Sequence, residues 1–496
     1  MRQRTTFFHL NEDAIDPLEL KIQGRSISGP SIRAVREDKF TFGLDELPSE
    51  VREILPNTAE LHLRWSSSAS HDLIASGPWT SRLPPGLHAF YTPHEAEQAS
   101  DPICIFLRNT SSFHDCSQSL DRYTRLPNDR FSHSTAFQAY LPIARRDLGG
   151  FPVFAADYIC PDSDDECNKR IHGLDGVDLL DVSYDTISHV VKITVLWGFE
   201  EQPLKITGHP DHRVEIGLLT PNAAEHLEDH DIGVAGLLTV LGEDTKPSPV
   251  MFSFPTRHKA AGATFTSDFT SPTSLHPTLQ LHISSSKPPV DDTYCSLHAY
   301  FTLPNSIFAD KYQLEDPLFL SSKNLTALRF ITHPVDLEAP DYVLKSWGSS
   351  VLLELKPSAE DGDFTAEIPL HLRYKKPNHG GEESLKVPYP AVFWACAAEE
   401  GTKFPNNPFD RVNLGYDGLF GPRTLFWHLD PAPQTDNLML TASVPVLDLN
   451  KTQWVGTSTG AAVLIGFAFV TWKLMTVFLR SGHGLHSKVN TEKKSQ

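Results

Sequence analysis

The sequence predicts a mainly β protein, built from tandem antiparallel β-sandwich-like domains and one C-terminal transmembrane helix. Short segments with apolar residues at every second position recur along the chain, for example at 190–199, 351–355 and 364–374. The 38 prolines and 29 glycines divide the rest into short pieces. A long apolar stretch near the C-terminus is long enough to cross a hydrocarbon core of ~30 Å. Together these patterns favour packed sheets tethered to a membrane.

Composition along the chain suggests how these elements are grouped. The chain is expected to divide into six regions: a β-rich N-terminal region of one or two domains at 1–263, a Ser-, Thr- and Pro-rich linker at 264–289, a second β domain at 290–432, a connector at 433–453, the transmembrane helix at 454–479 and a basic tail at 480–496. Within the second domain, strict alternation in 367–374 (EIPLHLRY) places Ile368, Leu370, Leu372 and Tyr374 on one strand face, which we expect to be buried.

The predicted membrane helix carries small residues at regular spacing. Residues 456–460 (GTSTG) match the GxSxG pattern of a nucleophile elbow, but that motif requires a soluble α/β sheet around it. Small residues four positions apart instead form a smooth face where a second helix can approach closely. The predicted packing faces are Gly456 with Gly460, and Ser458 with Ala462 and Gly466. The alternative is a helix that serves only as an anchor.

Charge around the helix predicts its orientation. At or beyond the C-terminal end of the span lie Lys473, Arg480, Lys488, Lys493 and Lys494, whereas only Lys451 lies close before it. The positive-inside rule therefore favours a cytosolic C-terminus and a luminal N-terminal bulk. Lys493 and Lys494 stand third and fourth from the end, like the dilysine signal that coat proteins bind in the cytosol to return membrane proteins to the endoplasmic reticulum. The sequence thus predicts a single-pass protein of the endoplasmic reticulum membrane.

Two further features bear on this topology. Sequons at Asn109, Asn324 and Asn450 precede the helix, so a luminal bulk would allow N-glycosylation. The first 20 residues contain no apolar core of 7–15 residues, so no cleaved signal peptide is expected. That second feature also fits a tail-anchored protein whose bulk is cytosolic, which remains the alternative topology.

Six cysteines lie before the helix, and an oxidising lumen would allow them to form disulfides. The candidates are Cys104, Cys116, Cys160, Cys167, Cys295 and Cys396. Six cysteines allow 15 pairings, and sequence alone does not select one. Short loops favour Cys104 with Cys116 and Cys160 with Cys167, which would leave Cys295 with Cys396. Free buried thiols are the alternative for any of them.

The remaining composition identifies no catalytic, cofactor-binding or metal-binding residues. The net charge of −19 does not suit nucleic acid, because phosphate backbones require basic surfaces. No P-loop, dinucleotide fingerprint, kinase motif set or HExxH motif is present. Carboxylates are abundant throughout this acidic chain, so pairs of them do not single out a glycosidase site.

Residues 293–396 carry a recognisable pattern. Its parts are Thr293-Tyr294-Cys295, Leu303-Pro304, 308–314 (FADKYQL), 336–342 (DLEAPDY) and 368–377 (IPLHLRYKKP). The order of these segments before a C-terminal span resembles the PIG-X family. Three earlier segments, 41–47 (TFGLDEL), 61–65 (LHLRW) and 85–93 (PGLHAFYTP), are similar to the extended fungal members of that family.

The resemblance implies a non-catalytic subunit that stabilises the multispan catalytic subunit of GPI mannosyltransferase I. That enzyme adds the first mannose to the GPI-anchor precursor in the endoplasmic reticulum. The resemblance also implies a role in the folding of other proteins of that compartment. The alternative is a luminal carbohydrate-active enzyme whose carboxylate site has no recognisable sequence pattern.

Overall fold

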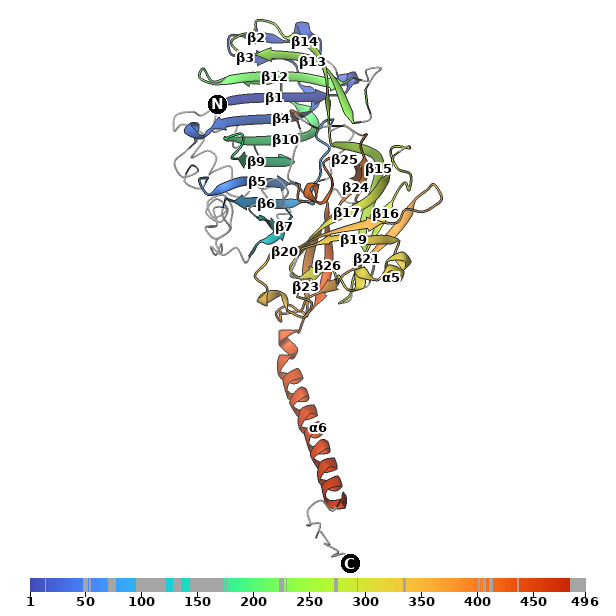
Figure 1. Cartoon of the computed structure of the whole chain (residues 1–496). Coiled ribbons are helices and arrows are strands. Elements are labelled where there is room, and N and C mark those ends of the chain that lie inside the picture. Colours follow the sequence, from blue (N-terminus) through green and yellow to red (C-terminus); the bar gives the residue numbers. More distant parts are fainter. Residues whose placement is uncertain are drawn as a thin grey trace, which may run out of the picture. The chain divides into compact units, whose positions relative to one another are not determined.

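A computed structural model of the chain provides the structure (Figure 1). The residues that it describes are 1–13, 15–47, 52, 55–69, 77–94, 122–127, 135–142, 174, 176–222, 227–228, 230–271, 275–291, 293–332, 336–399, 402, 404, 407–409, 414–434 and 437–481. The chain forms two compact units. Unit 1 comprises Met1–Tyr374 and Ser384–Ser443, and unit 2 comprises Lys375–Glu383 and Val444–Gln496.

Unit 1 contains an eleven-stranded sheet in the order β14-β13-β12-β1-β4-β10-β9-β5-β6-β8-β7. Its strands are β1 (Arg2–His9), β4 (Ile32–Gly43), β5 (Thr58–Ser66), β6 (Gly86–Pro93), β7 (Thr124–Leu126), β8 (Ala136–Leu141), β9 (Leu179–Asp185), β10 (Val190–Gln202), β12 (Arg213–Pro221), β13 (Asp231–Val240) and β14 (Ser248–Pro255). Neighbouring strands are antiparallel except β1 and β12, which run parallel with Arg2 opposite Arg213.

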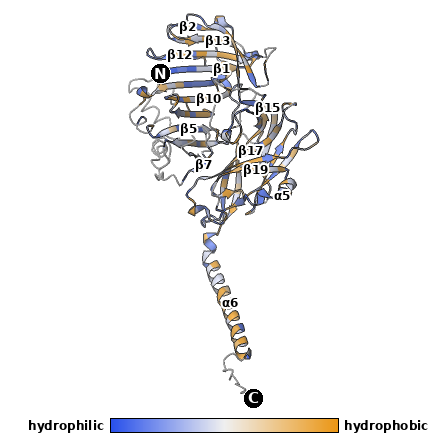
Figure 2. Cartoon of the chain, viewed as in Figure 1, coloured by the Kyte–Doolittle hydropathy of each residue, from blue (hydrophilic) through white to orange (hydrophobic). Residues whose placement is uncertain are grey.

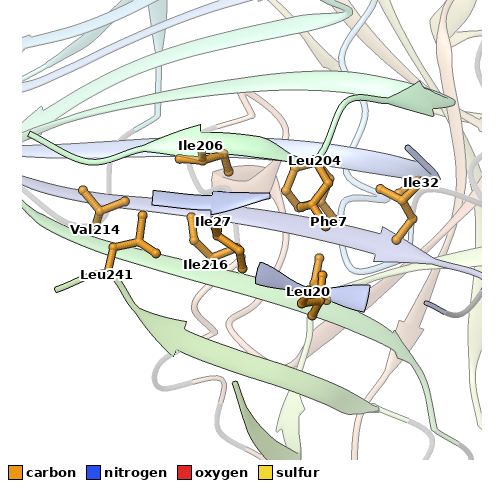
Figure 3. Close-up of a cluster of buried hydrophobic side chains, with 11 residues drawn as sticks. Phe7, Leu20, Ile27, Ile32, Leu204, Ile206, Val214, Ile216 and Leu241 are labelled. Atoms are coloured by element: carbon orange, nitrogen blue, oxygen red, sulfur yellow. The ribbon is translucent and has the colours of Figure 1, made fainter. Parts of the chain in front are cut away.

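A small three-stranded sheet covers part of this large sheet. Its strands, in spatial order, are β11 (Lys205–Thr207), β3 (Ser26–Ser28) and β2 (Lys21–Gln23). Ile27 and Ile206 of the small sheet pack in one buried cluster with Phe7, Val214 and Ile216 of the large sheet (Figure 3). Burial of these aliphatic side chains is what joins the two layers, since each contributes roughly 1.5–3 kcal/mol when it leaves water.

A second large sheet of unit 1 has eight strands in the order β19-β20-β17-β24-β25-β15-β16-β21. Its strands are β15 (His258–Phe269), β16 (Thr278–Ile283), β17 (Cys295–Pro304), β19 (Leu325–Ile331), β20 (Gly348–Leu355), β21 (Phe364–Pro369), β24 (Ala391–Ala397) and β25 (Thr424–Pro431). Here β15 and β25 are the parallel pair, with a register shift between Ala260 and Thr264. The mainly β prediction is thus correct, while the two parallel pairs were not expected.

The remaining elements are short, apart from the last helix. Two two-stranded sheets pair β18 (Ile307–Phe308) with β22 (His371–Leu372), and β23 (Glu382–Pro388) with β26 (Met439–Pro445). The helices within the described residues are η1 (Asn11–Asp13), η2 (Pro17–Glu19), η3 (Leu44–Glu46), η6 (Gln313–Glu315), α5 (Pro317–Ser322), η7 (Asp341–Val343), η8 (Asp417–Leu419), η9 (Leu449–Lys451) and α6 (Thr452–Ser481). Figure 2 shows mostly hydrophobic colours along α6, as the sequence predicts.

Within unit 1 the two large sheets meet through side chains that are buried from both sides. Phe90 of β6 lies in one apolar cluster with Tyr300 of β17 and Phe393 of β24. At the edge of this cluster, the Ser350 hydroxyl donates to Gln138 Oε1 at 2.9 Å, and the Tyr300 hydroxyl donates to Ser350 Oγ at 3.0 Å. The N-terminal strands and the second β domain therefore share a core.

Two segments differ from the sequence-based expectation. The linker expected at 264–289 contains the end of β15 and all of β16, and both strands lie inside the eight-stranded order. Polar residues in this segment alternate with Phe265, Leu279, Leu281 and Ile283, which are buried. Composition indicated a linker, but the period of two determines the structure. Likewise β26 occupies part of the connector expected at 433–453.

Candidate functional site: three segments that converge on Arg373

Three segments that are distant in sequence meet around Arg373. The first, 304–314, pairs with 371–372 through β18 and β22, with Ile307 opposite Leu372 and Phe308 opposite His371. The second, 336–342, contacts the same place, because the Asp341 backbone N–H donates to the Tyr374 carbonyl at 3.1 Å. The 368–374 segment thus lies between the other two and contacts both.

Arg373 itself connects all three segments. Its side chain is buried, and its guanidinium carbon lies 4.2 Å from the centroid of the Phe308 ring. Its Nη1 donates to the Ala339 carbonyl at 2.8 Å, and its backbone N–H donates to the Ser306 carbonyl at 2.9 Å. Burial lowers the pKa of Arg373, and the carboxylates of Asp336 and Asp341 oppose that shift. An arginine side chain stays protonated even when its pKa is lowered in this way. The Phe308 ring and the Ala339 carbonyl therefore contact a buried cation.

Acidic side chains around Arg373 serve as acceptors in turns. Asp310 accepts the Tyr312 N–H at 2.9 Å. Asp336 accepts the N–H groups of Glu338 and Ala339 at 2.9 and 3.0 Å, and these bonds lower its pKa. Asp341 accepts from the Ser306 hydroxyl at 3.1 Å. Carboxylates that accept N–H groups two or three residues ahead fix loop shape, and the lowered pKa makes Asp336 a poor general acid.

His371 is the other titratable group at this site. Its ring stacks on Phe308 with centroids 5.3 Å apart, and its Nε2 lies 3.2 Å from Gln313 Oε1. Its Nδ1 lies 2.9 Å from Nδ1 of His276. Burial lowers the pKa of His371, His276 lowers it further, and Asp310 opposes both. Among the residues that the structure describes, no group of three or more His, Cys, Asp or Glu side chains could hold a metal ion.

A second group of buried polar side chains is shared by both large sheets of unit 1, with Arg64 and Asp181 on the eleven-stranded sheet and the His258–His428 pair on the eight-stranded sheet. Arg64 of β5 is fully buried and donates to both oxygens of Asp181, at 2.6 and 3.0 Å. His258 Nδ1 lies 2.9 Å from His428 Nε2, and both rings are buried. Burial lowers the pKa of His258 well below its usual value and that of His428 to about 3. Each of these two contacts joins neighbouring strands of one sheet, β5 with β9 and β15 with β25.

The cysteine and sequon predictions have mixed outcomes. A disulfide joins Cys295 of β17 to Cys396 of β24, which lie opposite each other in register. The other four candidates, Cys104, Cys116, Cys160 and Cys167, lie outside the described residues. Asn324 is exposed, with its side-chain amide donating to the Thr365 carbonyl at 2.8 Å. Asn450 is exposed in η9, and Asn109 lies outside the described residues.

The C-terminal predictions concern unit 2. Among the described residues, the segment Leu449–Arg480 is the one helix long and apolar enough to cross a membrane. All five small residues of the two predicted packing faces (Gly456, Gly460, Ser458, Ala462 and Gly466) lie on α6 and are exposed along it. A Cβ added at Gly456, Gly460 or Gly466 would meet no other part of the described chain. Lys493 and Lys494 lie outside the described residues.

Comparison with known proteins agrees with this architecture. The family model described as PIG-X / PBN1 matches residues 272–475. Protein pbn1 of Neurospora crassa is 51% identical over 488 residues, which cover 97% of each chain. The chain belongs to the PIG-X / PBN1 family. Protein PBN1 of Gibberella zeae is 43% identical, again over 97% of each chain, and protein pbn1 of Emericella nidulans is 40% identical over the same share.

Membership of the PIG-X / PBN1 family relates the chain to GPI-anchor biosynthesis and to the endoplasmic reticulum. The region matched by the family model begins just before β16 and extends into α6. It therefore contains all three segments that converge on Arg373. A solved BSP domain of a biofilm associated protein aligns at 6% identity with a TM-score of 0.14, which is too low to indicate a shared fold.

Sequence reasoning found the converging segments but not their geometry. The segments 308–314, 336–342 and 368–377 served as a family pattern, and a physical role was predicted only for 367–374, as a strand with one buried face. An available signal was the Asp-x-x spacing at Asp310 and Asp336, since Asp side chains often accept N–H groups two or three residues ahead. The burial of Arg373 carried no such signal, because arginine is nearly always expected on the surface.

Proposed function

We propose that this chain is a non-catalytic, stabilising subunit of GPI mannosyltransferase I, the endoplasmic reticulum enzyme that adds the first mannose to the GPI-anchor precursor. The observation that carries the proposal is family membership along nearly the whole chain. The site around Arg373 supports it. Its titratable groups are engaged in turns, stacking and backbone contacts, which suits a surface for recognition.

A subunit without chemistry of its own can still raise enzyme activity. If it binds only the folded form of the catalytic subunit, it lowers the unfolded and degradable fraction by mass action. A preference of about 2–3 kcal/mol for the folded form changes that fraction roughly 30–150-fold. The same mechanism would extend to the folding of other proteins in the endoplasmic reticulum.

The proposal includes a topology. The bulk of the chain lies in the lumen, α6 crosses the membrane, and coat proteins bind Lys493 and Lys494 in the cytosol. Protease added to sealed microsomes should remove only the tail, and an endoglycosidase should shift the mobility of the chain unless Asn109, Asn324 and Asn450 are all replaced by Gln. Digestion of the whole chain would support the tail-anchored alternative. Golgi-type glycan processing should appear when Lys493 and Lys494 are both replaced by Ser.

The decisive experiment measures the partner. Deleting this chain should lower the amount of the multispan catalytic subunit, and purification in mild detergent should recover the two together. Mannose addition should then recover, at least in part, when the catalytic subunit is overproduced without this chain. If a single exposed carboxylate or histidine change stops mannose addition while both proteins stay abundant, the chain is an enzyme instead.

A further inference from the structure

Three exposed side chains belong to two segments of the Arg373 site that are joined by a backbone hydrogen bond. Tyr342, Val343 and Tyr374 are 54%, 61% and 67% exposed. The hydrogen bond from the Asp341 N–H to the Tyr374 carbonyl holds the first two beside the third. We call these three residues the tyrosine patch. Large apolar groups that a fold leaves together in water commonly mark a contact with another surface.

Covalent connection ties this patch to the membrane helix. Tyr374 is bonded to Lys375, the first residue of unit 2, and Asn378 follows three residues later. Within unit 2, the Asn378 N–H donates to the Leu447 carbonyl at 3.2 Å, and the Leu449 N–H donates to the Asn378 carbonyl at 2.9 Å. Helix α6 begins only three residues after Leu449. The Cα atoms of Tyr374 and Asn378 are four steps of about 3.8 Å apart along the chain, so at most about 15 Å separates them. Asn378 is in turn hydrogen-bonded to the segment that leads into α6.

The chemistry of the patch matches one surface at that distance. Tyrosine has an apolar ring and a polar hydroxyl, and it concentrates where lipid headgroups meet water. Lys345 lies shortly after Tyr342 and Val343, Lys376 lies two residues after Tyr374, and both lysines are exposed. A lysine side chain can lay its methylene groups along an apolar surface while its ammonium group stays in water. Asp336 and Glu338 are exposed there too, so the patch suits zwitterionic headgroups better than strongly anionic ones.

We propose that the tyrosine patch inserts into the headgroup layer of the membrane that α6 crosses. The occupant of the patch is therefore lipid. Unit 1 would then contact the membrane at two places, through its chain connection to α6 and through Tyr342, Val343 and Tyr374. Such a second contact would hold the Arg373 site at a fixed height and orientation above the bilayer. This inference requires α6 to span the membrane, but it does not depend on the mannosyltransferase role.

Site-specific photocrosslinking in native membranes tests the proposal. The photoreactive amino acid p-benzoylphenylalanine is placed in the full chain at Tyr342 or at Tyr374, where an aromatic ring already stands in solvent. Microsomes are irradiated, and the purified chain is analysed by mass spectrometry for adducts of phosphatidylcholine and phosphatidylethanolamine. The control position is Met251 of β14, which is 74% exposed on the eleven-stranded sheet. Val343 is a further position if either variant fails to accumulate.

Phospholipid adducts at 342 and 374, at several times the yield seen at 251, are the expected result. Adducts to a second protein at these positions would overturn the proposal and make the patch a protein interface. Lipid yields equal to that at 251 would also overturn it. As a second measurement, Tyr342→Ser with Tyr374→Ser should lower the lipid adduct at Val343, whereas Met251→Ser should not.

Discussion

Arg373 joins the three converging segments, so its replacement has a sharp expected effect. Arg373→Met keeps most of the apolar stem but removes the hydrogen bond to the Ala339 carbonyl and the charge over Phe308. We expect a loss of about 2–3 kcal/mol in unfolding free energy, because hydrogen bonds from charged groups contribute about 1.5–3 kcal/mol. Urea unfolding of the purified chain measures it. Arg423→Met, at an exposed position, is the control and should change little.

An unchanged midpoint for Arg373→Met would contradict the central role of this side chain. Arg373→Lys refines the test, because lysine keeps the charge but lacks the planar guanidinium that stacks on a ring and donates from a fixed fork. Lysine should therefore restore only part of the stability. Full restoration would mean that charge alone holds the segments together.

The buried pair His258 and His428 predicts a dependence of stability on pH. Burial lowers both pKa values, that of His428 to about 3, while the unfolded chain titrates near about 6.5. Below about pH 6.5 the unfolded chain therefore binds more protons than the folded chain, and stability falls as pH falls. Between about pH 7 and about pH 5.5 the expected loss is about 1 kcal/mol for each histidine.

Urea unfolding at these two pH values measures that loss. Burial also lowers the pKa of His88 to about 3 and that of His298 to about 4. Because His428→Gln removes one of these buried groups, its stability should depend less on pH than that of the parent chain. His282→Gln, at an exposed position on β16, should leave the dependence unchanged. A His428→Gln chain whose stability depends on pH as strongly as that of the parent would show that His428 does not stay neutral on folding.

At the scale of elements, the disulfide between β17 and β24 closes a long loop. Cys295 and Cys396 are 101 residues apart in sequence, and they fix two neighbouring strands of the eight-stranded sheet. In the chain-entropy account, a loop of this length gives a stabilisation of up to about 4–5 kcal/mol. The double variant Cys295→Ala, Cys396→Ala should therefore accumulate far less, as pulse-chase labelling would show. A normal half-life would mean that the sheet needs no covalent link.

The two small-residue faces of α6 predict a graded effect on the partner. Gly460→Ile with Gly466→Ile puts bulk on both faces, and the amount of catalytic subunit should fall only partly, since helix contacts in lipid are worth about 1–2 kcal/mol. Ala468→Ile is the matched control. At 100° per residue it lies about 80° from Gly460 and from Ser458, so it lies between the two sets and belongs to neither. An equal effect of Ala468→Ile would mean that neither face has a specific role.

Element-level prediction from sequence succeeded where periodicity was strong and failed where strands break. Ile368, Leu370 and Leu372 are buried as alternation predicts, yet Tyr374 is exposed and Arg373 is buried. The alternation fails because β21 ends at Pro369 and β22 spans only His371–Leu372. Long-range contacts with 304–314 and 336–342 then decide which side chains are enclosed. No local pattern encodes those contacts.

For the whole molecule, the shared core between the two large sheets decides how the chain behaves as a unit. The family model begins at residue 272, which suggests a separable C-terminal part. The structure argues otherwise, because Phe90 packs with Tyr300 and Phe393, and Gln138 bonds to Ser350. Sequence reasoning placed a linker near this boundary because side-chain contacts between distant strands leave no composition signal.

The final prediction follows from that shared core. A chain that lacks residues 1–257 would expose the apolar face around Tyr300, Phe393 and Phe426, which is buried in the full chain. Large side chains of this kind contribute roughly 1.5–3 kcal/mol each when buried, so losing several removes much of a typical stability of about 5–15 kcal/mol. The truncated chain should therefore be degraded, with a half-life well below that of the full chain.

Residues 1–257 supplied as a separate chain in the same compartment should restore part of the abundance of the truncated chain. Gln138→Leu in that separate chain should weaken the restoration, because it removes an acceptor of the Ser350 hydroxyl, whereas a change at exposed Ile187 should not. A truncated chain as abundant as the parent would show that the eight-stranded sheet folds alone.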